Sequence, residues 1–241
     1  MNPVLMLCHN TVELTKPAIE SIRAQDIDQT LYVIDNASMD ETQNVLKDNK
    51  VLNWRMYPAK GVSASWNFGL DYFFNTAMCE YVWVVNNDVV FRPDTLRELI
   101  ADGGDFVTGV GVSSMEQIQT PFVKSIRPNP DFSCFLIRKN VWRTIGQFDE
   151  NMVLYASDAD YHIRMHHAGI HAYTIGMPFY HVASGTIKQA TDAERNMIQI
   201  QANIDRQAFL MKWGCLPGST DYSARFGPAT FGADHAHKKE A

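Results

Sequence analysis

The stretch "VWVVNNDVVF" at residues 82–91 decides the fold, because its first half suits a strand that is buried on both faces of a sheet. Asn86, Asn87 and Asp88 then interrupt the apolar run. An isolated carboxylate is costly to bury, so Asp88 must be solvated, paired or bound to a cation. The stretch therefore predicts a buried strand that ends where polar side chains meet water or a ligand.

Other apolar segments in the N-terminal half alternate with amphipathic helices. Strands are expected at 3–8, 30–35, 53–58 and 81–86. Helices are expected to begin near Thr15, at the capping-box spacing of Ser38 to Glu41, at Gly61 and near Pro93. This alternation implies an α/β fold with a Rossmann-like, mostly parallel sheet covered by helices on both faces.

Ligands of such sheets gather at the carboxyl ends of the strands. In this chain that edge collects residues 8–10, 35–36, 59–63 and 86–88. The polar interruption at Asn87 and Asp88 therefore falls where a ligand is expected.

The C-terminal half has a less regular pattern. Residues 103–132 indicate loops with one strand at 105–112, followed by a strand at 133–139, a short helix at 140–145 and a helix that ends at Gly169. Two short strands are expected at 171–176 and 178–182. A long helix at 191–213 carries an apolar stripe, which is expected to pack on the sheet rather than to pair with another subunit: Met197, Ile200, Ile204, Ala208 and Met211.

Composition limits the class of protein. The chain has 241 residues, 46% of them hydrophobic, which is enough for one large domain or two joined lobes. Its formal net charge of -6 gives no general reason to bind nucleic acid or an anionic membrane. The four cysteines lack zinc-site or disulfide-framework spacing, and neither a signal peptide nor a membrane span is evident, so a cytoplasmic protein is expected.

Two polar positions at the sheet edge have both a structural and a functional interpretation. Asn87 and Asp88 either form an Asx-type turn or contact a ligand. Asp35 either organises the turn before Ser38 or accepts a hydrogen bond from a nucleotide. The chain lacks the glycine fingerprints of dinucleotide-binding and P-loop folds, which argues against a dehydrogenase or a P-loop enzyme.

Three positions in the second half of the chain also have both a structural and a functional interpretation. Asp158 and Asp160 stand near a helix start, where the helix dipole favours a carboxylate, and Asp160 can also pair with Arg164 four residues later. His181 follows an aromatic strand and either packs there or binds a metal. Because the HExxH pattern is absent, a zinc protease has no support.

At these residues the sequence resembles the family 2 glycosyltransferases of the nucleotide-sugar-dependent GT-A fold, especially the rhamnosyltransferase-like members. The similar segments follow one another in the family's order: "MLCHNTVELTKPAIESI" (6–22), "YVIDNASMDET" (32–42), "KGVSASWNFGL" (60–70), "VVNNDVVFRPDTLREL" (84–99) and "FLIRKNVWRTIGQFDENMVLYASDADYHIRMHHAG" (135–169). Together they cover nearly the whole ordered chain.

The resemblance implies a role for each matching residue. Asp158 would be the catalytic base, and Asp88 with His181 would hold Mn²⁺ or Mg²⁺ at the donor diphosphate. The residues expected to bind the nucleotide, with Asp35 at the base and Asn87 at the ribose, are Cys8, His9, Asn10, Asp35, Lys60, Asn67 and Asn87.

Two departures from the family pattern affect these roles. The metal motif is Asn-Asn-Asp rather than Asp-x-Asp, so Asp88 is its only carboxylate and metal binding without donor should be weak. Ser157 replaces the glutamate expected before the base, and it could cap the helix instead. The expected reaction is inverting transfer of a sugar from a nucleoside-diphosphate sugar, with a UDP- or dTDP-sugar as donor.

The implied organisation is a nucleotide-sugar-binding lobe at 1–108, an acceptor-binding and catalytic lobe at 109–218 of the same domain, and a partly disordered tail at 219–241. The acceptor is expected to be a glycan or lipid-linked sugar, with a protein or a modified DNA base as other candidates. The competing interpretations are a nucleotide-sugar-binding module without turnover and a sugar nucleotidyltransferase. The latter lacks its glycine-rich N-terminal loop in this chain.

Overall fold

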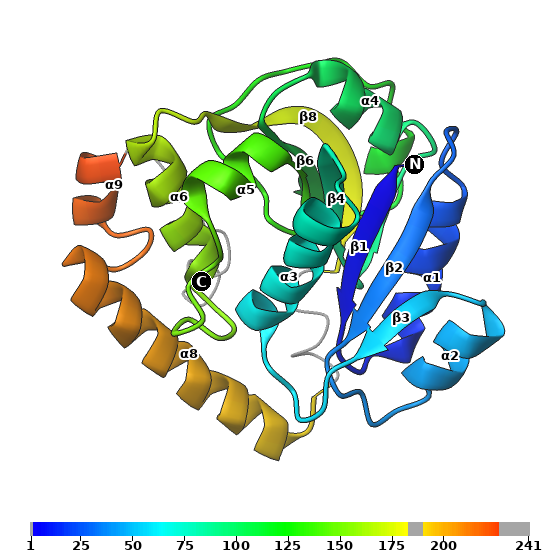
Figure 1. Ribbon diagram of the computed structural model, residues 1–241, viewed down its shortest axis with the longest axis horizontal. Coiled ribbons are helices and arrows are strands. Elements are labelled where there is room, and N and C mark those ends of the chain that lie inside the picture. The colour runs from blue at the N-terminus through cyan, green and yellow to red at the C-terminus, as the bar shows by residue number, and fades with distance from the viewer. Residues whose placement is uncertain (1, 183–189, 227–241) are drawn as a thin grey trace.

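The computed structural model describes residues 2–182 and 190–226, and within these the chain forms one eight-stranded sheet covered by helices (Figure 1). The strands are β1 (Pro3–Cys8), β2 (Thr30–Asp35), β3 (Leu52–Arg55), β4 (Tyr81–Asn86), β5 (Val89–Val90), β6 (Phe106–Val112), β7 (Cys134–Arg138) and β8 (Ala172–His181). The helices are α1 (Val12–Arg23), α2 (Thr42–Asp48), α3 (Val62–Asp71), α4 (Thr95–Asp102), α5 (Lys139–Ile145), α6 (Ser157–His167), α8 (Asp192–Trp213) and α9 (Thr220–Phe226). A π-helical turn, Tyr72–Thr76, extends α3.

The sheet order is β3-β2-β1-β4-β7-β6-β8-β5. Strands β1 to β4 are parallel, β7 runs antiparallel between β4 and β6, and β5 runs antiparallel on β8. The expected mostly parallel α/β sheet is confirmed. Because β4 pairs with β7, one sheet runs through both predicted lobes.

Helices cover both faces because β4 alternates its apolar side chains between them. Trp83 and Val85 join the core beneath α1, α2 and α4, whereas Val82 and Val84 join the core beneath α3, α5 and α6. A third apolar cluster joins α6, α8 and α9, with Phe209 and Tyr222 fully buried. The segment 220–226, expected to be tail, is therefore helical, while the rest of the predicted tail, 227–241, lies outside the described residues.

Several expected boundaries differ from the structure. Helix α1 begins at Val12 rather than Thr15, after Asn10 and Thr11 adopt left-handed conformations. The two strands expected at 171–182 form one strand, because Gly176 has φ of 78° and lets the chain continue through an irregular register. Ser38 does not cap α2, which begins at Thr42, since both its hydroxyl and its N–H bind the neighbouring strand ends.

The prediction for α8 was wrong in one respect. The helix begins at a capping box formed by Thr191 and Glu194 and ends at Gly214, as expected. Its buried side chains, however, are Ala202, Asp205 and Phe209 rather than the apolar stripe. The stripe lies on a neighbouring side of the helix and, apart from the partly buried Ala208, is exposed, because a buried carboxylate occupies the face that contacts the protein.

Candidate active site

Strand β5 brings Asp88 and His181 together. Val89 pairs with His181 in the β5–β8 ladder, and the N–H of Val182 donates to the carbonyl oxygen of Asp88 at 2.9 Å. As a result the Nε2 atom of His181 lies 3.4 Å from Oδ1 of Asp88, although the residues are 93 positions apart in the sequence. The structure therefore places the two predicted metal ligands side by side.

This pair fits a divalent cation whose remaining ligands come from a donor diphosphate and water. A carboxylate oxygen and an imidazole nitrogen are both accepted by Mn²⁺, and Mg²⁺ is commonly bound through one or two carboxylates plus substrate phosphates. Among the described residues no group of three or more His, Cys, Asp or Glu side chains is placed to hold a metal. If a metal binds here, Asp88 and His181 would supply two of its ligands.

The carboxyl ends of β1 and β2 form the predicted nucleotide end of the site. The Nδ1 atom of His9 lies 2.6 Å from the carbonyl oxygen of Asn36. The N–H of Asn10 donates to Ser38 Oγ at 2.8 Å, and its Oδ1 accepts from the N–H of Met39 at 2.8 Å. The φ of 54° at Asn10 lies in the left-handed region, which Asn tolerates better than most residues.

Asp35 is fully buried and bound from several sides. Its Oδ1 accepts from the N–H of Ser38 at 2.9 Å, and its Oδ2 accepts from the side-chain amide of Gln43 and lies 3.5 Å from Nε of Arg55. These bonds fit the interpretation of Asp35 as an organiser of the turn. Arg55 is half-exposed, so a charged donor group also stands at this end of the site.

Cys8 lies directly beside Asp35. Its thiol sulfur is 4.0 Å from Oδ1 of that carboxylate. Burial raises the pKa of the Cys8 thiol well above its usual value, and the charge of Asp35 adds to this effect. Cys8 is therefore a neutral wall of the predicted pocket.

Three other predicted nucleotide ligands are used within the protein. Asn87 donates its amide to Thr15 Oγ1 at 2.8 Å. Lys60 donates its backbone N–H to Oδ1 of Asn36 at 2.7 Å, while its side chain is exposed. Asn67 is buried and binds residues of another segment, so it positions that segment instead of lining the sheet edge.

We call that segment, residues 146–156, the base loop because it leads into Asp158. Asn67 donates to the carbonyl oxygen of Phe148 at 2.9 Å and accepts from the same residue's N–H at 2.7 Å. Val62 donates its N–H to the carbonyl oxygen of Val153 at 2.8 Å. A Cβ on Gly61 would lie 2.7 Å from that same carbonyl oxygen, so the close approach requires glycine.

Asp205 of α8 holds the base loop from the other side. This fully buried carboxylate accepts hydrogen bonds from the N–H groups of Val153, Leu154 and Tyr155 at 3.0, 2.8 and 2.8 Å. The sequence analysis missed Asp205. The sequence pattern that could have indicated it is the helical spacing of Asp205 with Ala202 and Phe209, which places one carboxylate on an otherwise apolar face.

Asp158 lies in the first turn of α6, and its Oδ1 accepts from the N–H of Ala159 at 2.8 Å. Ser157 is not the helix cap, because Ala156, with φ of 65°, occupies that position and Ser157 is the first helical residue. Burial raises the pKa of the Asp158 carboxyl above its usual value, and the charge of Asp131 raises it further, against the hydrogen bond from Ala159. A carboxylate with a raised pKa is a stronger base.

Asp131, which the sequence analysis missed, connects the base with the metal-type pair. Its Oδ2 accepts from the N–H of Gly111 at 3.0 Å. A Cβ on Gly111 would lie 3.0 Å from Asp131 Oδ2 and 3.5 Å from Nδ1 of His181. Since Asp131 also acts on the pKa of Asp158, the predicted base and the predicted metal ligands share one region.

Asp160 has the structural role that its spacing suggested. It is fully buried and accepts from Nε of Arg164 at 2.9 Å and from Nε1 of Trp213 at 3.0 Å, with Nζ of Lys212 at 2.7 Å. These contacts join α6 to the end of α8. Asp160 therefore fixes the helix that carries Asp158.

The mostly parallel sheet, with helices on both faces, has the GT-A type of fold that the similar solved structures described below share. The model of glycosyl transferase family 2 matches residues 4–161, and the chain belongs to this family. Comparison with curated proteins gives no significant match.

Two solved structures illustrate the similarity. The mannosyltransferase PcManGT from Pyrobaculum calidifontis, in complex with GDP-Man and Mn²⁺, has a TM-score of 0.64 and 16% identity, covering 89% of this chain and 65% of that one. TarS 1-349 from S. aureus, in complex with UDP, has a TM-score of 0.58 and 15% identity, covering 93% and 75%. This chain thus spans about two thirds of the mannosyltransferase, and the similarity shows the fold alone.

No helix among residues 2–182 and 190–226 combines the length and apolar character needed to cross a bilayer. The four cysteines are unpaired thiols.

Proposed function

We propose that this chain is an inverting glycosyltransferase that moves a hexosyl or rhamnosyl-type sugar from a nucleoside-diphosphate sugar to an acceptor hydroxyl. The observation that carries the proposal is the contact of Asp88 with His181, near Asp131, whose charge also raises the pKa of Asp158. Family membership supports sugar transfer, and the neighbours' complexes with GDP-Man and UDP support a nucleotide-sugar donor without fixing its base.

The protein's own groups divide the work between donor and acceptor. Asp35, His9 and Asn10, which bind neighbouring protein groups at the β1–β2 end, would also contact the nucleotide, and uracil or thymine is the base we expect. Asp88 and His181 would hold Mn²⁺ or Mg²⁺, which would supply positive charge at the donor diphosphate. The neighbour that contains Mn²⁺ supports this assignment.

On the acceptor side, Asp158 accepts the proton of the acceptor hydroxyl as that oxygen attacks the anomeric carbon. The bond from this carbon to the diphosphate oxygen breaks, and the nucleoside diphosphate leaves with the electron pair. Because attack comes from the face opposite the leaving group, the anomeric configuration inverts. The raised pKa of Asp158 favours proton uptake.

The acceptor we expect is a glycan or lipid-linked sugar, bound by the lobe at 109–218. We place the reaction in the cytoplasm, since a reducing compartment keeps unpaired thiols such as Cys79 reduced.

Thermal stabilisation by nucleotide sugars tests this proposal. A panel of UDP-, dTDP- and GDP-sugars is measured with and without Mn²⁺, and at least one donor should raise the melting temperature, more so with Mn²⁺. Asp88→Asn should remove the Mn²⁺-dependent part of this increase, whereas Asp28→Asn, at an exposed position, should retain it. If no donor stabilises the chain under either condition, the proposal is wrong.

The second candidate is a binding module without turnover, favoured by the single carboxylate of the metal motif and by Ser157. Donor hydrolysis and transfer assays separate it from the enzyme. A donor that stabilises the chain but is never cleaved, with a series of glycan acceptors present, would favour the module.

A further inference from the structure

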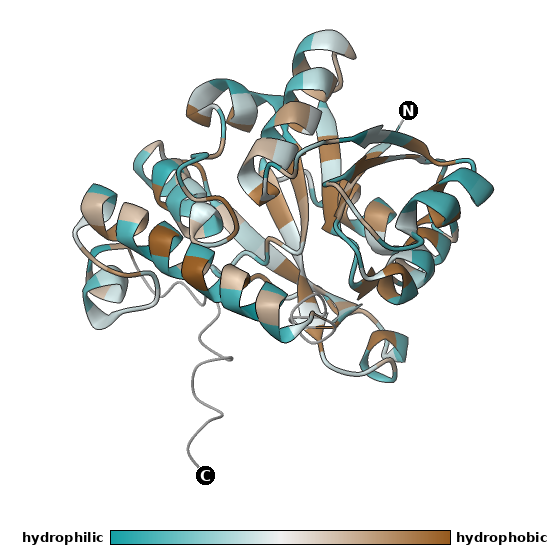
Figure 2. Cartoon of the chain, turned by 90° about the horizontal axis from the view of Figure 1, so that it is seen from below, coloured by the Kyte–Doolittle hydropathy of each residue, from teal (hydrophilic) through white to brown (hydrophobic). Residues whose placement is uncertain are grey.

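The apolar stripe of α8 is an exposed surface on the outer margin of the molecule (Figure 1). Met197, Ile200, Ile204 and Met211 are exposed by 66%, 48%, 52% and 81%. Viewed from below, brown apolar residues recur along this helix (Figure 2). Within the described part of the chain, these side chains are not covered, which is unusual for four large apolar residues on one helix side.

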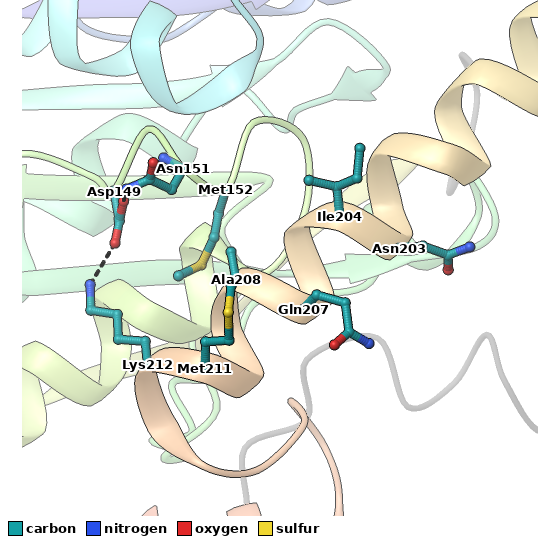
Figure 3. A pocket seen from close by; sticks show the side chains of 9 residues that line it. All are labelled: Asp149, Asn151, Met152, Asn203, Ile204, Gln207, Ala208, Met211 and Lys212. Carbon is teal, nitrogen blue, oxygen red and sulfur yellow. Dashed lines mark hydrogen bonds and ion pairs between the residues drawn. The ribbon is translucent and has the colours of Figure 1, made fainter.

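A cavity of about 720 Å³ borders the stripe, between α8 and the base loop (Figure 3). Met152 of the base loop faces Ala208 and Met211 of α8 across it, and none of the predicted site residues lines it. Together, stripe and cavity form an apolar groove beside a helix. Such a groove suits the apolar side of another helix.

The spacing of the stripe identifies that helix. Met197, Ile200, Ile204, Ala208 and Met211 are separated by 3, 4, 4 and 3 residues, so the pattern reads the same in both directions about Ile204. In an antiparallel pair of identical helices, a twofold axis at Ile204 brings each residue opposite its mirror position. Met197 then lies opposite Met211 of the partner subunit, along about 21 Å of helix at 1.5 Å per residue.

The charges of α8 also fit an antiparallel copy. Its first turn carries Asp192 and Glu194, and its last turn carries Lys212, which also pairs with Asp149 and Asp160 of its own copy. The antiparallel arrangement brings the acidic start of one helix near the basic end of the other, with opposed helix dipoles. A membrane surface is a poorer match, because interfacial helices are rich in Lys and Arg and this chain has a net charge of -6.

We propose that two copies of this chain pair through α8, antiparallel about a twofold axis at Ile204. The apolar side chains of each helix enter the cavity beside the base loop of the other copy.

Sedimentation of the whole chain tests this pairing. The unaltered chain should sediment as a concentration-dependent dimer. Ile204→Asp places two carboxylates beside the axis, and it should raise the dimer dissociation constant by about a hundredfold or more. Ile126→Asp is the matched control, because Ile126 is also exposed, at 65%, and lies outside α8, so it should leave the dimer intact.

A charge pair tests the register. Met197→Glu and Met211→Lys should each weaken the dimer, because each buries a charge opposite an apolar methionine of the partner subunit. The double variant should recover dimerisation, since the carboxylate introduced at position 197 of each copy then faces the ammonium group introduced at position 211 of the other copy. Recovery of the fold is checked by circular dichroism for each variant.

Two results would overturn the proposal. One is an unaltered chain that remains monomeric up to about millimolar concentration. The other is a double variant no more dimeric than either single one. A monomer that floats with phosphatidylglycerol and phosphatidylcholine vesicles, and loses flotation with Ile204→Asp, would assign the stripe to a membrane instead.

Discussion

The two ends of the candidate site hold their carboxylates by different means. Asp35 is bound by Ser38, Gln43 and Arg55, all within 20 positions along the chain. Asp158, among the described contacts, accepts hydrogen bonds from its own helix turn, and its position depends on a loop that Asp205 holds from a distant helix. The contacts of Asp35 are therefore close in sequence, whereas the support of Asp158 comes from remote parts of the chain.

This difference fits the roles proposed for the two ends. A recognition group gains from being fixed by many hydrogen bonds, since little conformational freedom is then lost when a ligand binds. A base must keep its affinity for a proton, which additional hydrogen-bond donors would reduce. Support for Asp158 therefore acts on the backbone around it, through Asp205 and Asp160, and leaves its carboxyl with few partners.

The largest effect is expected at Asp158. Asp158→Asn should lower the rate of transfer by about 10² to 10⁴, the usual contribution of a positioned base, while donor binding persists. Its folded-state pKa is raised, so the ionised carboxylate opposes folding at neutral pH and its removal should keep or increase the melting temperature. Transfer assays and thermal melts at pH 7 measure both.

Asp160→Asn is the matched control two positions away. It should lower the melting temperature, since Arg164 and Lys212 lose a buried partner. Unchanged transfer by Asp158→Asn would rule out Asp158 as the base.

The next effect is on the support of the reactive end. Asp205→Ala leaves three backbone N–H groups of the base loop without their acceptor, at about 1 to 3 kcal/mol each when buried. A loss of about 3 kcal/mol corresponds to a decrease of roughly 6 to 12 °C in melting temperature for a chain of this size. Turnover should decrease more than donor affinity.

Asp192→Ala, on the same helix, has a side chain that is 98% exposed and should shift the melting temperature by no more than about 2 °C. Equal melting temperatures for the two variants would contradict the role of Asp205.

A smaller effect is expected at the nucleotide end. Asp35→Asn removes the charge that Arg55 and Gln43 bind, and donor affinity should decrease about 10- to 100-fold, the usual range for a charged hydrogen bond. Titration calorimetry with the best donor measures this change. Asp48→Asn, at an exposed position, should bind normally, and a dissociation constant that Asp35→Asn leaves unchanged would contradict nucleotide binding at this end.

The smallest effect concerns pH. The rate should increase with pH as Asp158 loses its proton, with a midpoint above the usual pKa of an aspartate. Asp131→Asn removes a negative neighbour, lowers the pKa of Asp158 and should move that midpoint to lower pH. A pH profile of kcat/KM measures the shift, and an unmoved midpoint would show that Asp131 does not act on the base.

The sequence predicted best what depends on neighbouring residues. Strand ends at Cys8, Asp35 and Asn86 were predicted at the observed positions because each apolar run ends in a polar residue. The meeting of Asp88 and His181 came from the family resemblance, since β5 has only two residues and no pattern of its own.

What could not be predicted depends on contacts between distant segments. On α8, both the apolar stripe and the set Ala202, Asp205 and Phe209 have helical spacing, so the sequence allows either to be the buried face. The hydrogen bonds of Asp205 to the base loop decide which face is covered. Likewise, nothing local shows that Asn67 binds Phe148 or that the charge of Asp131 acts on the pKa of Asp158.

The buried position of Asp205 also affects how this chain could be recombined with its relatives. The family match ends at residue 161, which looks like a natural crossover point for a chimera. A crossover there would separate Asp160 from Lys212 and the base loop from Asp205. Residues 1–161, which include Asp158, would then meet a different α8 that lacks these contacts. Functional hybrids should therefore exchange segments after Trp213, where the helix that holds the loop has ended.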